Sequence, residues 1–151
     1  MKSDVVQLVF CLLVLALGGA VEDLMPKVLG VGFPVLLMSA LFLAPRRPAL
    51  VSALFALAAG GCEDSLSSLP FATSASFFSL AAVSVRSSRM SYVAMAVAYP
   101  AYQTWLWLWR PGIEGSVFSH VAASVPVGIL TAAVVSAVLY MSERGAAIGE
   151  S

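Results

Sequence analysis

Apolar residues fill this chain in long continuous runs, which short polar or helix-breaking segments separate. Six runs can be drawn, at residues 5–21, 28–44, 49–62, 71–85, 92–109 and 118–141. Pro, Gly, Ser or charged residues follow the runs, and such residues typically end helices or start turns. The runs lack the alternation of a transmembrane barrel strand. The pattern predicts an all-α integral membrane protein: one domain, residues 1–151, forming a compact bundle of about six transmembrane helices.

Composition agrees with a membrane protein and argues against several functions. Hydrophobic residues make up 60% of the chain and charged residues 11%, with a mean hydropathy of +0.95. In soluble domains, about a quarter of the residues are charged. The formal net charge is zero and no basic run is present, so nucleic acid is not expected as a partner.

No familiar catalytic or metal-binding motif occurs. The sequence has no nucleophile elbow, no HExxH and no Gly-rich phosphate loop. Cys11, Cys62 and His120 each stand without a second ligand at a suitable spacing. We therefore expect a non-enzymatic protein without a metal or cofactor.

The basic residues predict the orientation in the membrane. If both termini are cytoplasmic, six of the eight Lys and Arg residues lie inside and only Lys27 and Arg110 lie outside. The cytoplasmic basic turns are then formed by Arg46, Arg47, Arg86 and Arg89. The first run could instead be a cleaved signal peptide, but Asp4 offsets the only leading basic residue, Lys2. A retained first helix is the preferred interpretation.

Two adjacent carboxylates follow a run that is short for a membrane span. A helix that starts after Pro48 reaches Glu63 after about 22 Å, whereas the hydrocarbon core is about 30 Å thick. The run at 71–85 is similarly short. The sequence therefore predicts a recessed outer turn, although an ordinary solvated turn is an alternative. The residues expected to contact a partner or ligand are Glu63, Asp64, Ser65, Ser67, Tyr102 and Trp105.

Small residues at helical spacing predict where helices pack together, since close approach drives helix association in lipid. In the last run, Ser124, Gly128, Ala132 and Ser136 recur every four residues. Gly60, Gly61 and Pro70 are the other predicted structural positions. Tyr102, Trp105 and Trp109 share one helical face, which suggests an aromatic belt at the outer surface or a partner-binding patch.

Residues 45–78 resemble the MreD family of rod shape-determining membrane proteins. The likeness lies in an Arg-Pro turn (Arg46, Arg47, Pro48), a glycine segment (Gly60, Gly61), an acidic position (Asp64) and a short turn before the next helix. The resemblance implies a non-enzymatic scaffold in the bacterial cytoplasmic (inner) membrane. Its expected partners are membrane lipid, an MreC-like membrane protein and other cell-wall elongation proteins.

A second family gives an alternative function. Six short helices with an irregular outer segment also resemble the substrate-binding subunits of energy-coupling-factor vitamin transporters. On that interpretation the acidic turn, Tyr102 and Trp105 would line a ligand cavity that opens to the outside.

Overall fold

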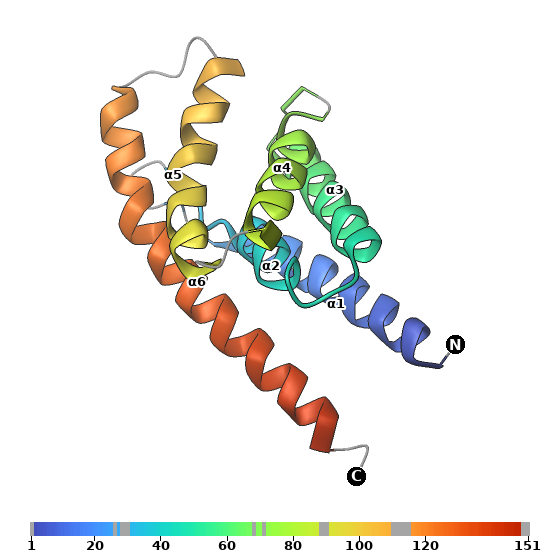
Figure 1. Ribbon diagram of the computed structural model, residues 1–151. Coiled ribbons are helices and arrows are strands. Elements are labelled where there is room, and N and C mark those ends of the chain that lie inside the picture. The colour runs from blue at the N-terminus through green and yellow to red at the C-terminus, as the bar shows by residue number, and fades with distance from the viewer. Residues whose placement is uncertain are drawn as a thin grey trace.

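The computed structural model of the protein describes residues 2–25, 27, 31–67, 69–70, 72–87, 91–109 and 116–148. Helices are the only extended elements of secondary structure in these residues, which contain no strand. The helices are α1 (Lys2–Leu24), α2 (Val35–Leu43), α3 (Ala49–Leu66), α4 (Thr73–Ser87), α5 (Ser91–Trp109) and α6 (Val117–Ile148). Figure 1 shows them in chain order from blue to red.

Within the described residues, three helices are long and apolar enough to cross a membrane: α1 over Val5–Leu24, α3 over Ala49–Leu66 and α6 over Val117–Gly145. Their apolar side chains are largely exposed, with Leu17 64%, Leu54 58% and Leu130 57% accessible. Exposed apolar surface of this kind marks contact with a membrane or with other proteins. The described part of the chain is therefore helical, with three helices long and apolar enough to span a membrane, whereas the six-span arrangement stays a prediction.

The second predicted span, 28–44, differs from the observed helix. α2 begins only at Val35, after Pro34 at its N-cap, and its 9 residues cover only about 14 Å. Residues 31–34 are not helical, and 28–30 lie outside the described residues. Pro34 delays the start of the helix because proline has no N–H and fixes φ. Hydropathy located the apolar run but does not register this effect.

α2 forms the centre of the molecule. Leu36 to Leu43 are all buried, and α2 contacts each of the five other helices. α3 packs along α4, and α5 packs along α6. Figure 1 shows these two pairs on either side of α2, with α1 beneath α3. Because α2 is almost entirely apolar, the helices around it bury nearly all of its surface.

The first turn of α1 and the last turns of α6 lie at the same end of the molecule (Figure 1). The turn between α2 and α3 belongs to this end too, because Arg47 forms an ion pair with Glu143 of α6 at 3.0 Å. This end carries Arg46, Arg47 and Arg86, three of the basic residues that were predicted to be cytoplasmic. Which side of a membrane it faces stays a prediction.

Candidate functional site

Glu63 and Asp64 lie inside α3, not in a turn after it. α3 continues to Leu66 and is 18 residues long, about 27 Å, so the expectation of a short third span ending at residue 62 is wrong. Polar residues lowered the mean hydropathy at the end of this run, but two of them form hydrogen bonds with residues of α3. Ser65 Oγ donates to the Gly61 carbonyl at 2.9 Å, and Ser67 Oγ donates to Glu63 Oε1 at 2.8 Å. α4, with 15 residues, is as short as predicted.

The Asp64 carboxylate binds the N-terminus of α4. Its Oδ1 accepts a hydrogen bond from the Ser74 amide at 2.7 Å, and its Oδ2 accepts one from the Ala75 amide at 3.4 Å. The residue is only 4% exposed. The first amides of a helix have no partner within the helix and carry partial positive charge, so a carboxylate there is stabilising. Asp64 is thus buried and hydrogen-bonded.

Gly60 lets α3 approach α4 closely enough for this bond. A Cβ atom on Gly60 would lie 2.3 Å from Ala75 Cα and 2.5 Å from its amide nitrogen, which no side chain can tolerate. Asp64 follows Gly60 by one helical turn and therefore shares its face. A Cβ on Gly61 would meet nothing within 4 Å, so the two predicted glycines point in different directions.

Two aromatic residues of α5 meet the same end of α4. The Tyr102 hydroxyl lies 2.5 Å from Ser74 Oγ, and Trp105 Nε1 donates to the Thr73 carbonyl at 3.0 Å. Tyr102 is buried and packs edge-on against Phe78. An outer belt is therefore wrong for Tyr102, whereas Trp109 is 52% exposed. The structure thus brings together Asp64, Tyr102 and Trp105 around the start of α4.

The turn between α3 and α4 is short and internally bonded. Both the amide and the hydroxyl of Thr73 donate to the Pro70 carbonyl, at 3.2 and 2.8 Å. Ala72 has a φ of +69°, in the left-handed region that glycine favours. Pro70, which was predicted to be a structural residue, is therefore the first residue of the turn that starts α4.

Glu22, which was not among the predicted site residues, also accepts a hydrogen bond from the N-terminus of a helix, as Asp64 does. Its Oε2 accepts a hydrogen bond from the Leu36 amide at 2.9 Å, in the first turn of α2. Its carboxyl lies beside that of Glu63. Nearby, the Tyr99 hydroxyl donates to the Gly32 carbonyl. The only sequence signal was an acidic residue before a run broken by Gly and Pro.

The other predicted residues lie away from this cluster. Ser124 and Gly128 are buried, and a Cβ on Gly128 would lie 3.0 Å from Tyr99 Cβ of α5. Ala132 and Ser136 continue this face and are half-buried. They place α6 against its neighbours as the spacing predicted for a packing face.

Three predicted basic residues gather at the turn between α2 and α3. Arg47 binds Glu143, and Arg46 Nε lies 3.9 Å from the same carboxylate. Arg86 NH1 donates to the carbonyls of Ala44 and Arg47 at 2.9 and 2.7 Å. Arg89 lies outside the described residues.

The cluster around Asp64 can bind and position backbone, and nothing in its geometry indicates a reaction. Over the described ranges, no group of three His, Cys, Asp or Glu side chains is placed to hold a metal ion. No family model, curated protein or solved structure matches the chain.

Proposed function

We propose that this protein is a non-enzymatic scaffold of the bacterial cell-wall elongation complex, located in the cytoplasmic (inner) membrane as a multi-pass protein. It binds partner membrane proteins, among them an MreC-like protein, through its helix faces. The proposal rests on one observation above the others: residues 45–78, which resemble the MreD family, fold as one closely bonded hairpin. Gly60 and Asp64, two of the residues that carry the resemblance, join α3 to α4.

A surface suited to a partner helix lies beside this hairpin, between α1 and α3. Its volume is about 540 Å³. Most of its lining residues are small, and one, Asp23, is acidic. The lining residues are Leu15, Ala16, Gly19, Ala20, Asp23, Ala58, Gly61, Cys62, Ser65 and Leu66. We call it the small-residue groove.

The composition of the small-residue groove supports protein binding. Transmembrane helices associate through small residues, which allow two backbones to approach closely. A Cβ on Gly19 or on Gly61 would meet nothing within 4 Å, so neither glycine is needed for packing inside this chain. Ser65 lines the groove, and its hydroxyl, which donates to the Gly61 carbonyl, can still accept a hydrogen bond from a partner.

The vitamin-transport alternative receives less support from the geometry. It requires Tyr102 and Trp105 to line an open ligand cavity. Instead, Tyr102 is 3% exposed and both polar atoms are bonded to the start of α4. The experiment below distinguishes the vitamin-transport alternative from the scaffold function.

The proposal is tested by depletion and complementation in a rod-forming host. Loss of the protein should make cells round, and the wild-type chain should restore rods and recover an MreC-like protein on affinity purification. Gly19→Leu combined with Gly61→Leu should fill the small-residue groove and abolish both effects. Gly145→Leu is the matched control, because a Cβ there also meets nothing within 4 Å.

Normal shape after depletion would refute the scaffold function. If instead a small vitamin-like molecule copurified and Asp64→Ala released it, the transport alternative would replace the proposal. Restoration of rods by the Gly19→Leu, Gly61→Leu variant would show that partners bind elsewhere.

A further inference from the structure

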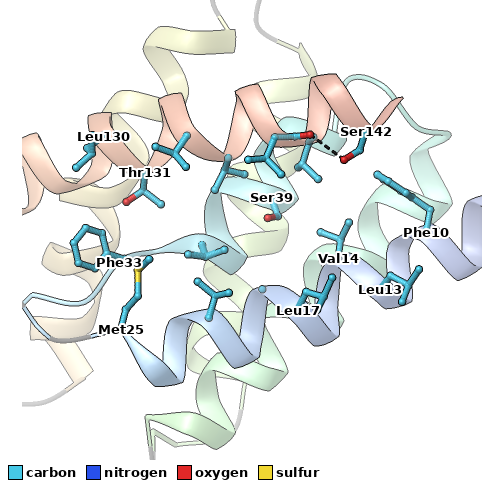
Figure 2. A pocket seen from close by; sticks show the side chains of 17 residues that line it. Phe10, Leu13, Val14, Leu17, Met25, Phe33, Ser39, Leu130, Thr131 and Ser142 are labelled. Atoms are coloured by element: carbon cyan, nitrogen blue, oxygen red, sulfur yellow. Dashed lines mark hydrogen bonds between the residues drawn. The ribbon is translucent and has the colours of Figure 1, made fainter. Parts of the chain in front are cut away.

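A second groove lies on the opposite side of α1 and opens sideways between α1 and α6. The two helices do not contact each other, but each packs on α2, which forms the floor. The groove has a volume of about 530 Å³. Figure 2 shows α1 and α6 as its two walls, with Ser39 on the floor between them. We call it the apolar groove.

Large apolar side chains line the apolar groove. They include Leu13 and Leu17 from α1, Phe33 from the segment before α2, and Leu130 and Val134 from α6. Leu13, Leu17 and Val134 are 55%, 64% and 55% exposed, so the groove is open along its length. Bulky branched residues hold a partner backbone at a distance, unlike the small residues through which membrane helices associate.

The dimensions favour a hydrocarbon chain over a helix. From Phe10 to Met25 the groove follows α1 for about 22 Å, longer than the roughly 15 Å of one leaflet's hydrocarbon layer. A helix about 10 Å across would have to lie against the bulky branched side chains of both walls. An acyl chain is thin enough to enter.

Positive charge stands at the end of the groove that is nearer the termini. Phe10 lines the groove, and the Arg47 guanidinium lies 5.3 Å from its ring centre. Arg46 and Arg86 gather at the same turn, and Glu143 is the carboxylate that pairs with Arg46 and Arg47 there. Three arginines and one carboxylate leave a positive balance that complements an anionic headgroup.

We propose that the apolar groove binds one anionic phospholipid. One acyl chain lies between α1 and α6 on the floor formed by α2, and the headgroup phosphate meets Arg46 and Arg47. The lipid fills the space that separates α1 from α6 and so ties the two helices together. This site is separate from the small-residue groove and does not depend on the proposed scaffold function.

Native mass spectrometry of the detergent-purified full chain tests the proposal, with dioleoyl phosphatidylglycerol and dioleoyl phosphatidylcholine as probes. We expect one phosphatidylglycerol to bind about thirtyfold more tightly than phosphatidylcholine, since each arginine near an anionic headgroup contributes about a factor of five. Arg46→Gln with Arg47→Gln should lower phosphatidylglycerol binding to the phosphatidylcholine level. Glu143→Gln should raise it about fivefold by removing the competing carboxylate.

A second pair of variants tests the acyl-chain position. Leu17→Trp with Val134→Trp should fill the groove and lower the binding of both lipids at least tenfold. Both side chains are more than half exposed, so the fold should accept the change. Leu12→Trp is the matched control, because Leu12 is 57% exposed on α1 but does not line the groove.

Several results would overturn the proposal. Equal binding of the two lipids by the wild type would remove the headgroup site, and so would a Glu143→Gln variant that binds less phosphatidylglycerol. Unchanged lipid binding by Leu17→Trp with Val134→Trp would remove the acyl chain from the groove. If that variant also lost a copurifying membrane protein, a partner helix would be the occupant.

Discussion

Asp64 and Glu22 both bind the N-terminus of a helix inside the bundle, yet they do so in different surroundings. Asp64 reaches Ser74 and Ala75, 10 and 11 residues further along one hairpin, and engages both carboxylate oxygens. Glu22 reaches Leu36, 14 residues away, through one oxygen at 2.9 Å. Asp64 is buried and Glu22 is half-buried. The α3–α4 joint is therefore fixed by several contacts at once, whereas the α1–α2 joint depends on fewer.

The close approach at Gly60 is the feature whose loss should have the largest effect. Gly60→Ala places a Cβ 2.3 Å from the Ala75 backbone, so α3 and α4 must separate and Asp64 loses its partners. We expect a loss of about 3 kcal/mol or more in the free energy of unfolding, measured by denaturant titration in detergent. Gly61→Ala, with open space around the new methyl group, should change stability by less than about 0.5 kcal/mol. Equal losses in the two variants would contradict the described crossing.

Removal of the Asp64 carboxylate should come next. Asp64→Ala leaves the amides of Ser74 and Ala75 buried without an acceptor, at an expected cost of about 2 kcal/mol. Asp23→Ala is a suitable control because that carboxylate is exposed. Thermal unfolding followed by far-UV circular dichroism measures both variants. If the Asp64→Ala variant melted at the same temperature as the control, the contact between α3 and α4 would not need the carboxylate.

The Glu22 joint should be weaker than the Asp64 joint. Glu22→Ala removes one hydrogen bond to the Leu36 amide, which should cost about 1 kcal/mol. Glu22→Gln keeps an oxygen that can accept this bond, so its cost should be smaller. The same unfolding measurement ranks the variants. A larger loss for Glu22→Ala than for Asp64→Ala would reverse the comparison.

The smallest expected effect is stabilising and concerns the turn that starts α4. Ala72 has a φ of +69°, a conformation that costs a non-glycine residue about 1 kcal/mol. Ala72→Gly relieves this strain but also gains freedom in the unfolded chain, so we expect a net gain of about 0.5 kcal/mol. A modest rise in melting temperature would support the turn geometry. A clear fall would show that Ala72 is not in this conformation.

The sequence predicted the helices better than it predicted their ends. Continuous apolar runs indicated the helical class, because hydrophobic length is a direct requirement of the bilayer. Hydropathy placed the end of the third helix at residue 62, whereas Glu63 to Leu66 continue it. The hydroxyls of Ser65 and Ser67 are satisfied by bonds to Gly61 and Glu63 of α3, which hydropathy does not register. The second helix was predicted too long, because Pro34 and the non-helical residues 31–33 before it do not lower the hydropathy of the run.

The candidate site was partly visible in the sequence. Gly60 and Asp64 lie four residues apart, so their shared face could be deduced, and Asp64 stood out as an acid in an apolar region. Glu22 could not be found in this way. Its target, the Leu36 amide, becomes an unsatisfied donor only because α2 starts inside the bundle. Which backbone groups lack partners is a property of the folded chain.

The bond between Asp64 and the start of α4 is tested most directly by amide hydrogen exchange in the full-length protein. The amides of Ser74 and Ala75 should be protected in the wild type, because they donate to the carboxylate. In Asp64→Ala they should exchange at least tenfold faster, which corresponds to about 1.4 kcal/mol of lost protection, while the amides around Gly128 in α6 stay unchanged. Equal protection of Ser74 and Ala75 in the two proteins would contradict the joint on which this account depends.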